Sequence, residues 1–247
     1  MKRWLSWILP AALLAFSGCR GGVTAPPVSG PAEAASSVLE GSVPPAAQRP
    51  PEPVILEALL PVEQYSSDRE ESISHVVLHF MSALVTNPAD PYNMESCRAT
   101  LLDGGVSTHY IIDREGSIHR LIPEERAAWH AGKGTWQRDG RYTNRMNQYA
   151  IGIELLGMGT EEEMSLYVTP AEYAALDPGW IGFTDAQYAS LRLLLDDILY
   201  RYPAIRRDRS HILGHEEYNP SKNDPGALFS WERIGVETIS LSSLLRS

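Results

Sequence analysis

Apolar positions along the chain fall into short runs and one long periodic stretch. Residues 74–80 (SHVVLHF) and 149–156 (YAIGIELL) are apolar and rich in β-branched side chains, which predicts buried strands. Residues 210–214 (SHILG) predict a last short strand. From 184 to 202, apolar residues recur at the spacing of one helix face. Thr184 and Gln187 fit a capping box at its start, and Pro203 ends it.

A hairpin and two further helices complete the pattern. Residues 108–113 and 117–122 are apolar segments joined by a turn that contains Gly116. Helical spacing over 93–102 stops before Asp103-Gly104-Gly105, and residues 231–234 start a terminal helix. Strands and helices alternate irregularly around one hairpin. The sequence therefore predicts an α/β (α+β) domain with a central mixed β-sheet flanked by helices.

The first residues have the features of a secretion signal. Lys2 and Arg3 precede an apolar run that is too short to span a membrane, so we expect residues 1–18 to be a signal peptide. The run ends at Ser17-Gly18-Cys19, which resembles a bacterial lipobox and implies acylation of Cys19. By resemblance to Gram-negative lipoproteins, Arg20 favours the outer membrane, with the protein facing the periplasm. A simple signal peptide with an incidental cysteine is the alternative.

Composition then limits the class of protein. Residues 19–53 are rich in Pro, Ala and Gly and are expected to form a tether, which leaves 54–247 as the folded domain. The net charge of -10 argues against a nucleic-acid partner, because such binding depends on cationic contacts to phosphates. Two cysteines cannot build a disulfide scaffold or a four-thiolate metal site. With Cys19 acylated, Cys97 has no intramolecular partner, so we expect it to be a plain thiol. Nothing indicates an obligate partner, and we expect a monomer.

Polar residues that interrupt the apolar strands are candidates for chemistry. His79 lies near the end of one strand, Glu154 lies inside another, and His215 follows a third. A buried carboxylate such as Glu154 needs a cation or polarised water nearby. Two imidazoles and one carboxylate leave an open position on zinc, as in catalytic sites. With Asp224 as the third ligand, Glu154 as acid/base and Lys222 beside the oxyanion, these residues fill the roles of a zinc hydrolase.

The same positions carry a family resemblance over residues 73–235. The chain resembles the zinc-dependent N-acetylmuramoyl-L-alanine amidases of type 2, in the superfamily of the peptidoglycan recognition proteins. The matching stretches are VVLH (76–79), VSTHYIID (106–113), AWHAG (128–132), IGIEL (151–155), GH (214–215) and KNDPG (222–226). The resemblance implies one Zn²⁺ per chain on His79, His215 and Asp224, with Glu154 and Lys222 as catalytic partners. It also implies a mixed sheet with helices on both faces.

The implied reaction is hydrolysis of the amide between N-acetylmuramic acid and L-alanine in peptidoglycan, which makes 54–247 a zinc amidase domain. An aspartate as the last ligand and the WHAG stretch favour the AmpD/AmiD branch, although the interval from His215 to Asp224 is one residue shorter here. By resemblance, His109, Trp129 and His130 contact the substrate or the site; otherwise they belong to the core or the rim. A non-catalytic peptidoglycan-binding lipoprotein on the same fold is the alternative function.

Other features are expected to be structural. We expect His75 and His211 to be structural or exposed, because each lies four residues before a candidate ligand in β-like sequence, where two such side chains stand too far apart to share a metal ion. We expect His119, on the outer half of the hairpin, to be structural as well. Residues 157–182 are expected to form an enlarged loop, in which the run Glu161-Glu162-Glu163 is solvated surface.

Overall fold

The computed structural model describes residues 48–236. The predicted signal peptide, Cys19 and most of the predicted tether lie outside these residues, as do residues 237–247. Within the described range, no helix combines the length and apolar character needed to cross a bilayer.

A mixed sheet organises the fold. Within residues 48–236 it has six strands in the order β1-β5-β4-β7-β3-β8, and only the hairpin pair β4–β5 is antiparallel. The strands are β1 (Ile55–Glu57), β5 (Ile118–Arg120), β4 (Tyr110–Ile112), β7 (Ala150–Leu156), β3 (His75–Met81) and β8 (Ile212–Gly214). The predicted mixed sheet, the hairpin and the three buried strands are confirmed.

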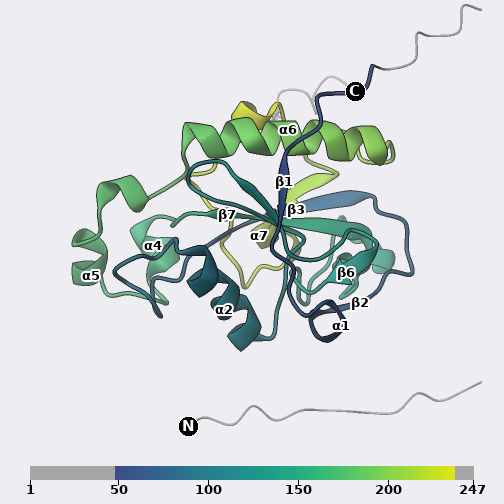
Figure 1. The fold of residues 1–247 in the computed structure, drawn as a ribbon. Coiled ribbons are helices and arrows are strands. Elements are labelled where there is room, and N and C mark those ends of the chain that lie inside the picture. Colours follow the sequence, from purple (N-terminus) through teal and green to yellow (C-terminus); the bar gives the residue numbers. More distant parts are fainter. Residues whose placement is uncertain (1–47, 237–247) are drawn as a thin grey trace, which may run out of the picture. The chain divides into compact units, whose positions relative to one another are not determined.

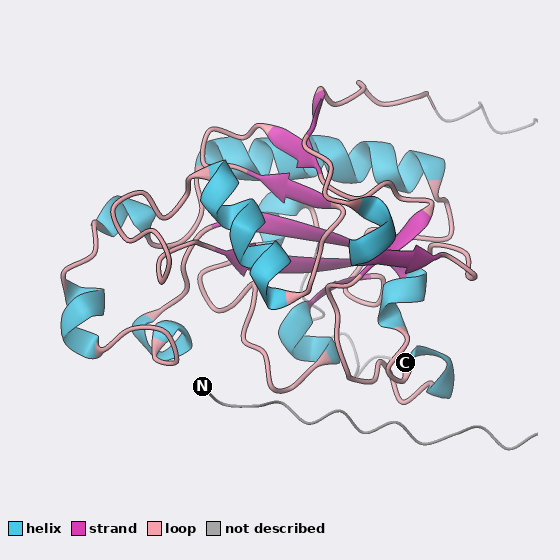
Figure 2. Ribbon diagram, turned by 60° about the horizontal axis from the view of Figure 1, so that its bottom comes forward, coloured by secondary structure: helices cyan, strands magenta, loops and turns pink. Residues whose placement is uncertain are grey.

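One face of the sheet is covered by the long helix α6 (Asp185–Arg201), as Figures 1 and 2 show. Alternate residues of β3 and β7 point towards it, since successive side chains of a strand face opposite sides. Val76, Leu78, Ile151, Ile153 and Leu155 thus share one core with the apolar stripe of α6. The capping box at the start of α6 is present, as the sequence predicts.

The opposite face of the sheet carries the remaining residues of the two central strands. Val77 and His79 point there from β3, where their register partners on β7 are Gly152 and Glu154. Helix α2 (Met94–Gly104) packs on this side through Cys97 and Leu101, against Ile111 of β4 and Leu156 of β7. Burial raises the pKa of the Cys97 thiol to about 12, consistent with an inert thiol.

Several short elements carry no clear hydrophobic pattern and are absent from the sequence prediction. They are β1, α1 (Val62–Tyr65), β2 (Ser66–Asp68), β6 (Arg126–Ala128), η1 (Gly140–Tyr142) and α3 (Met146–Tyr149). Strands β2 and β6 pair as a separate antiparallel ribbon. The terminal helix is instead one 3₁₀ turn, η3 (Trp231–Ile234), because Gly235 adopts a left-handed conformation and ends it. Helix α7 (His215–Tyr218) is equally short.

Residues 157–182 are not a plain loop. They contain α4 (Glu161–Met164), α5 (Pro170–Ala174) and the 3₁₀ turn η2 (Pro178–Trp180). Met158 and Met164 form a small core with Leu84, against which Trp180 packs. Arg114 donates to the carbonyls of residues at both ends of the segment, Leu156 and Gly182. The segment is therefore an ordered wall beside the sheet.

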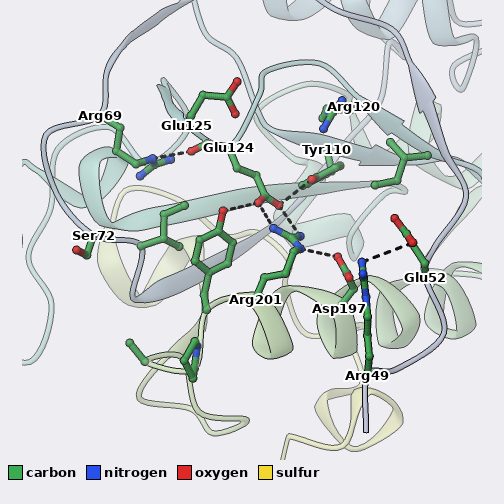
Figure 3. Close-up of a pocket in the computed structure, with 15 residues that line it drawn as sticks. Arg49, Glu52, Arg69, Ser72, Tyr110, Arg120, Glu124, Glu125, Asp197 and Arg201 are labelled. Carbon is green, nitrogen blue, oxygen red and sulfur yellow. Dashed lines mark hydrogen bonds and ion pairs between the residues drawn. The ribbon is translucent and has the colours of Figure 1, made fainter. Parts of the chain in front are cut away.

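A pocket of about 640 Å³ lies between the start of the described chain and the end of α6 (Figure 3). At its centre the buried Glu124 carboxylate accepts hydrogen bonds from Tyr110 and Tyr202, each at 2.7 Å, and pairs with Arg201. Arg201 also pairs with Asp197. Burial alone would raise the pKa of Glu124, but the Arg201 guanidinium and the two hydroxyls lower it below its usual range. These charges satisfy one another, which indicates a structural role.

Replacing Glu124 with glutamine is expected to destabilise the domain. The lost charge leaves Arg201 with Asp197 as its remaining ionic partner. Loss of the charged hydrogen bonds to Glu124 costs about 1–3 kcal/mol, which lowers Tm by roughly 2–12 °C for a chain of this size. Because the folded pKa of Glu124 is lowered, its contribution is present above the ordinary carboxyl pKa and disappears as the pH falls through the folded value. Thermal unfolding at several pH values measures this. The control is Glu125→Gln, which removes the same charge from the exposed neighbouring residue. An equal Tm for both variants at neutral pH would contradict the expectation.

Candidate metal centre

Three adjacent parallel strands bring the predicted site residues together at their carboxyl ends. His79 and Glu154 are register partners on β3 and β7, so their side chains lie next to each other on the face opposite α6. Gly214 pairs with Leu78 at the end of β8, and His215 follows it as the first residue of α7. Carboxyl ends of parallel strands are where open α/β sheets bind ligands. Asp224 comes from the loop that follows α7.

The three predicted ligands converge on one point. The Nδ1 atoms of His79 and His215 lie 3.1 Å apart, and Oδ2 of Asp224 lies 2.8 Å from the first and 3.0 Å from the second. All three residues are buried, and among the described residues they form the group of side chains that could hold a metal ion. The edge of a tetrahedral zinc site is about 3.3 Å, from a Zn–N distance near 2.0–2.1 Å. The spacing therefore fits a metal ion, and the shortened interval from His215 does not prevent Asp224 from reaching it.

The Nε2 atom of each imidazole points away from the centre and has a partner of its own, so that Nδ1 faces the centre. His215 Nε2 lies 3.0 Å from the carbonyl oxygen of Ala131, which can only accept, so this nitrogen carries the proton. His79 Nε2 lies 3.0 Å from Nδ1 of His130. A neutral imidazole protonated at Nε2 presents a lone pair at Nδ1. The Nδ1 lone pair of His215 thus faces the Asp224 carboxylate at 3.0 Å, and two acceptors this close need a cation between them.

Protonation states support the same interpretation. Burial, and then the neighbouring His215, lower the pKa of His79 to about 4, so its imidazole is neutral at physiological pH. Burial alone would raise the pKa of Asp224, but the adjacent imidazoles of His215 and His79 lower it below the ordinary value. A neutral imidazole and an ionised carboxylate are the forms that bind a metal ion.

Glu154 lies beside these ligands without a partner of its own. Its side chain is buried, and its Oε2 has no hydrogen-bond partner within the described structure. Burial, and then the charge of Asp224, raise the pKa of Glu154 well above its ordinary value. A carboxyl group of this kind can carry a proton near neutral pH. Lys222 is exposed and lines the same cleft, of about 600 Å³, into which Glu154 opens.

The three predicted contact residues are placed differently. His130 lines the cleft, and its buried Nε2 has no partner among the described residues. Its ring packs on Gly152, where a Cβ atom would come within 2.5 Å. His109 lies behind it, with Nδ1 accepting from the Gly152 N–H at 2.9 Å. Trp129 donates to Ser67 at 2.8 Å and is not part of the cleft lining described here, so its contact with substrate stays a prediction.

The cleft also has an apolar rim that the sequence analysis missed. Leu166 and Tyr167 line it from the segment after α4, with Val85 from the loop after β3 and Val106 from the loop after α2. These side chains are exposed, Leu166 by 81% and Tyr167 by 55%. In the sequence, the only indication of this rim is a pair of large apolar residues that follow the acidic run of residues 161–163. Their place at the cleft depends on the folded chain.

The remaining histidines are structural, as the sequence predicts. His75 is buried. Its Nδ1 lies within hydrogen-bond distance of the Ser74 hydroxyl, at 2.8 Å, and its ring stacks on the ring of His211 with 5.6 Å between the centroids. His211 pairs with Asp208, and His119 pairs with a carboxylate of its own hairpin.

A buried His-His-Asp group and an unpaired carboxyl group at the strand ends of an α/β sheet are typical of metal-dependent hydrolases. The N-acetylmuramoyl-L-alanine amidase family model matches residues 69–227, more than half of the chain. The chain therefore belongs to this family, whose enzymes hydrolyse the amide between N-acetylmuramic acid and L-alanine in peptidoglycan. The predicted amidase is confirmed, and the non-catalytic alternative is not favoured.

Individual relatives agree. The chain is 34% identical over 156 residues to the 1,6-anhydro-N-acetylmuramyl-L-alanine amidase AmpD of Citrobacter freundii. The aligned region covers 63% of this chain and 68% of AmpD. It is 31% identical to the amidase AmiD of Escherichia coli K12, over 60% of this chain but only half of AmiD.

Solved structures agree on the fold. A crystal structure of a selenomethionine derivative of AmpD has a TM-score of 0.52 at 27% identity, covering 72% of this chain and 91% of that chain. The structure of Escherichia coli AmiD in complex with the substrate anhydro-N-acetylmuramic acid-L-Ala-D-γ-Glu-L-Lys has a TM-score of 0.50 at 30% identity. The match covers 67% of this chain and 58% of the AmiD chain.

Proposed function

We propose that this chain is a zinc amidase whose metal is held by Nδ1 of His79, Nδ1 of His215 and the carboxylate of Asp224. The observation that carries the proposal is the convergence of three buried acceptors within 3.1 Å of one another. The Ala131 carbonyl supports it, since it holds the proton of His215 on Nε2 and leaves the Nδ1 lone pair free for a metal ion.

The protein's own residues divide the remaining work. A zinc ion held here would polarise the scissile carbonyl and lower the pKa of water towards neutrality. Glu154 takes the proton from the attacking water and delivers it to the leaving amine of L-alanine, a transfer for which its raised pKa suits it. Lys222, at the edge of the cleft, stabilises the oxyanion. His130 holds His79 in the tautomer that can bind the metal.

The substrate we propose is peptidoglycan or a muropeptide derived from it. AmiD in its solved complex binds an anhydro-muramyl peptide, and the AmpD relatives are named for the same 1,6-anhydro sugar. The cleft offers apolar side chains at its rim and Lys222 as a cation, which suits a sugar and an acidic peptide.

The place of action is proposed from the sequence alone. Residues 1–18 as a signal peptide, an acylated Cys19 and the tether to residue 53 would anchor the amidase domain to the outer membrane, facing the periplasm. This would place the enzyme beside the cell wall.

Incubation of the purified protein with sacculi tests the function. We expect release of peptides with a free L-alanine amino terminus, its abolition by a metal chelator and its recovery after addition of Zn²⁺. Mass spectrometry of the products identifies the bond that is cut. Binding to sacculi without any chelator-sensitive release would instead support the non-catalytic alternative.

A further inference from the structure

The loop of residues 219–227, which follows α7, carries both Lys222 and Asp224. One residue outside this loop, Glu163, forms hydrogen bonds with loop residues before and after Asp224. The side-chain amide of Asn223 donates to the backbone carbonyl of Glu163 at 2.7 Å. The backbone N–H of Ala227 donates to Oε1 of the Glu163 carboxylate, also at 2.7 Å. The metal-ligating position is thus bracketed by two hydrogen bonds to the same residue.

Glu163 is itself fixed at the start of α4. Its second carboxylate oxygen, Oε2, accepts from the backbone N–H of Thr160 at 2.7 Å, and its own N–H donates to the Thr160 hydroxyl. The two oxygens of one carboxylate are therefore divided between the cap of α4 and the loop. Glutamine has one acceptor oxygen and cannot serve both N–H groups.

The fit around this carboxylate is close. Gly226 has a positive φ of 77°, and a Cβ atom there would come within 2.5 Å of the Glu163 carboxylate. The loop is held on its other side by the Glu216 N–H, which donates to the carbonyl of Asp224 at 3.1 Å. Asp224 is thus held between α7 and α4. This corrects the expectation that the whole acidic run is solvated surface, because Glu161 and Glu162 are exposed but Glu163 is not.

We propose that Glu163 is a positioning residue that holds the loop of residues 219–227 so that the Asp224 carboxylate meets the two imidazoles. The inference rests on the proposed metal site. Glu163 acts through the loop and contacts neither the ligand atoms nor the cleft.

The test compares zinc affinity in three variants of the full chain. We expect Glu163→Gln to weaken Zn²⁺ binding about 10-fold, the lower end of the effect of losing a residue that orients a ligand. In the Co²⁺-substituted protein, the visible absorption bands should shift, because they report the ligand geometry. Glu162→Gln changes the same charge at an exposed neighbouring position and should leave both readouts unchanged.

Thr160→Ala separates the loop from the helix cap. It removes the hydroxyl of the cap but keeps the bond from Ala227 to Glu163, so it should lower thermal stability without changing zinc affinity. If Glu163→Gln does not fold, Asn223→Ala carries the same expectation, since it removes the other bond to Glu163.

The outcomes distinguish this inference from the proposed function. A wild-type protein that binds no Zn²⁺ would overturn the metal site itself. A wild-type protein that binds Zn²⁺, together with Glu163→Gln of equal affinity and an unchanged Co²⁺ spectrum, would overturn only the positioning role of Glu163.

Discussion

Replacing His79 with alanine is expected to remove metal binding and turnover together. In the proposed site His79 supplies one of three ligand atoms, and its loss leaves two, with Nδ1 of His130 also unpaired. Loss of a residue that merely orients a ligand already weakens binding by 10- to 100-fold, so loss of the ligand should cost more than ~100-fold. Zinc content by elemental analysis and release of muropeptides measure the two effects.

His75→Ala is the matched control for this prediction. His75 lies on the same strand, four residues earlier, and is equally buried, but it contacts Ser74 and His211 and not the metal group. We expect it to lose stability while keeping its zinc. If His79→Ala retains one zinc per chain, the assignment of this ligand is wrong.

Glu154→Gln is expected to lose turnover while keeping the metal. The amide is nearly isosteric and Glu154 is not among the three proposed ligands, so zinc content should equal that of the wild type. Without a group that accepts and returns the proton, kcat should fall about 10³-fold, within the usual range for general acid–base catalysis. Steady-state kinetics on a soluble muropeptide measure this.

Glu216→Gln is the control for Glu154→Gln. Glu216 also has a buried oxygen without a partner in the described structure, and it lies next to His215, but it does not line the cleft. The Glu216→Gln variant should therefore retain most of the wild-type kcat. Release of product by Glu154→Gln at the wild-type rate would refute the acid–base role.

Much of the fold could be predicted because its signals are local. Strands β3 and β7 are buried on both faces and therefore read as apolar runs, and α6 has one apolar stripe with a capping box at its start. Elements of three or four residues, such as β1 and β2, form because a neighbouring strand accepts them. Their own residues carry too little pattern to show it, and the 3₁₀ turn at 231–234 ends early because of a single glycine.

The candidate site residues also left a signal in the sequence. His79 and Glu154 stand out because a polar side chain inside an apolar strand needs a reason to be buried. Glu163 left none, since a run of three glutamates normally faces solvent. Its contact with Ala227 joins residues that are 64 positions apart. Likewise, the exposed Leu166 and Tyr167 become a cleft wall only when the segment packs beside the sheet.

The sequence by itself determined the residue types of the site and the strands that carry them, because burial and periodicity are written into neighbouring positions. Only the tertiary structure decided which atoms meet. The register of β3 with β7 places His79 beside Glu154, and hydrogen bonds at Nε2 select the nitrogen that faces the centre. Contacts from α4 hold the loop of Asp224 in place. Such contacts join distant segments, and local patterns do not encode them.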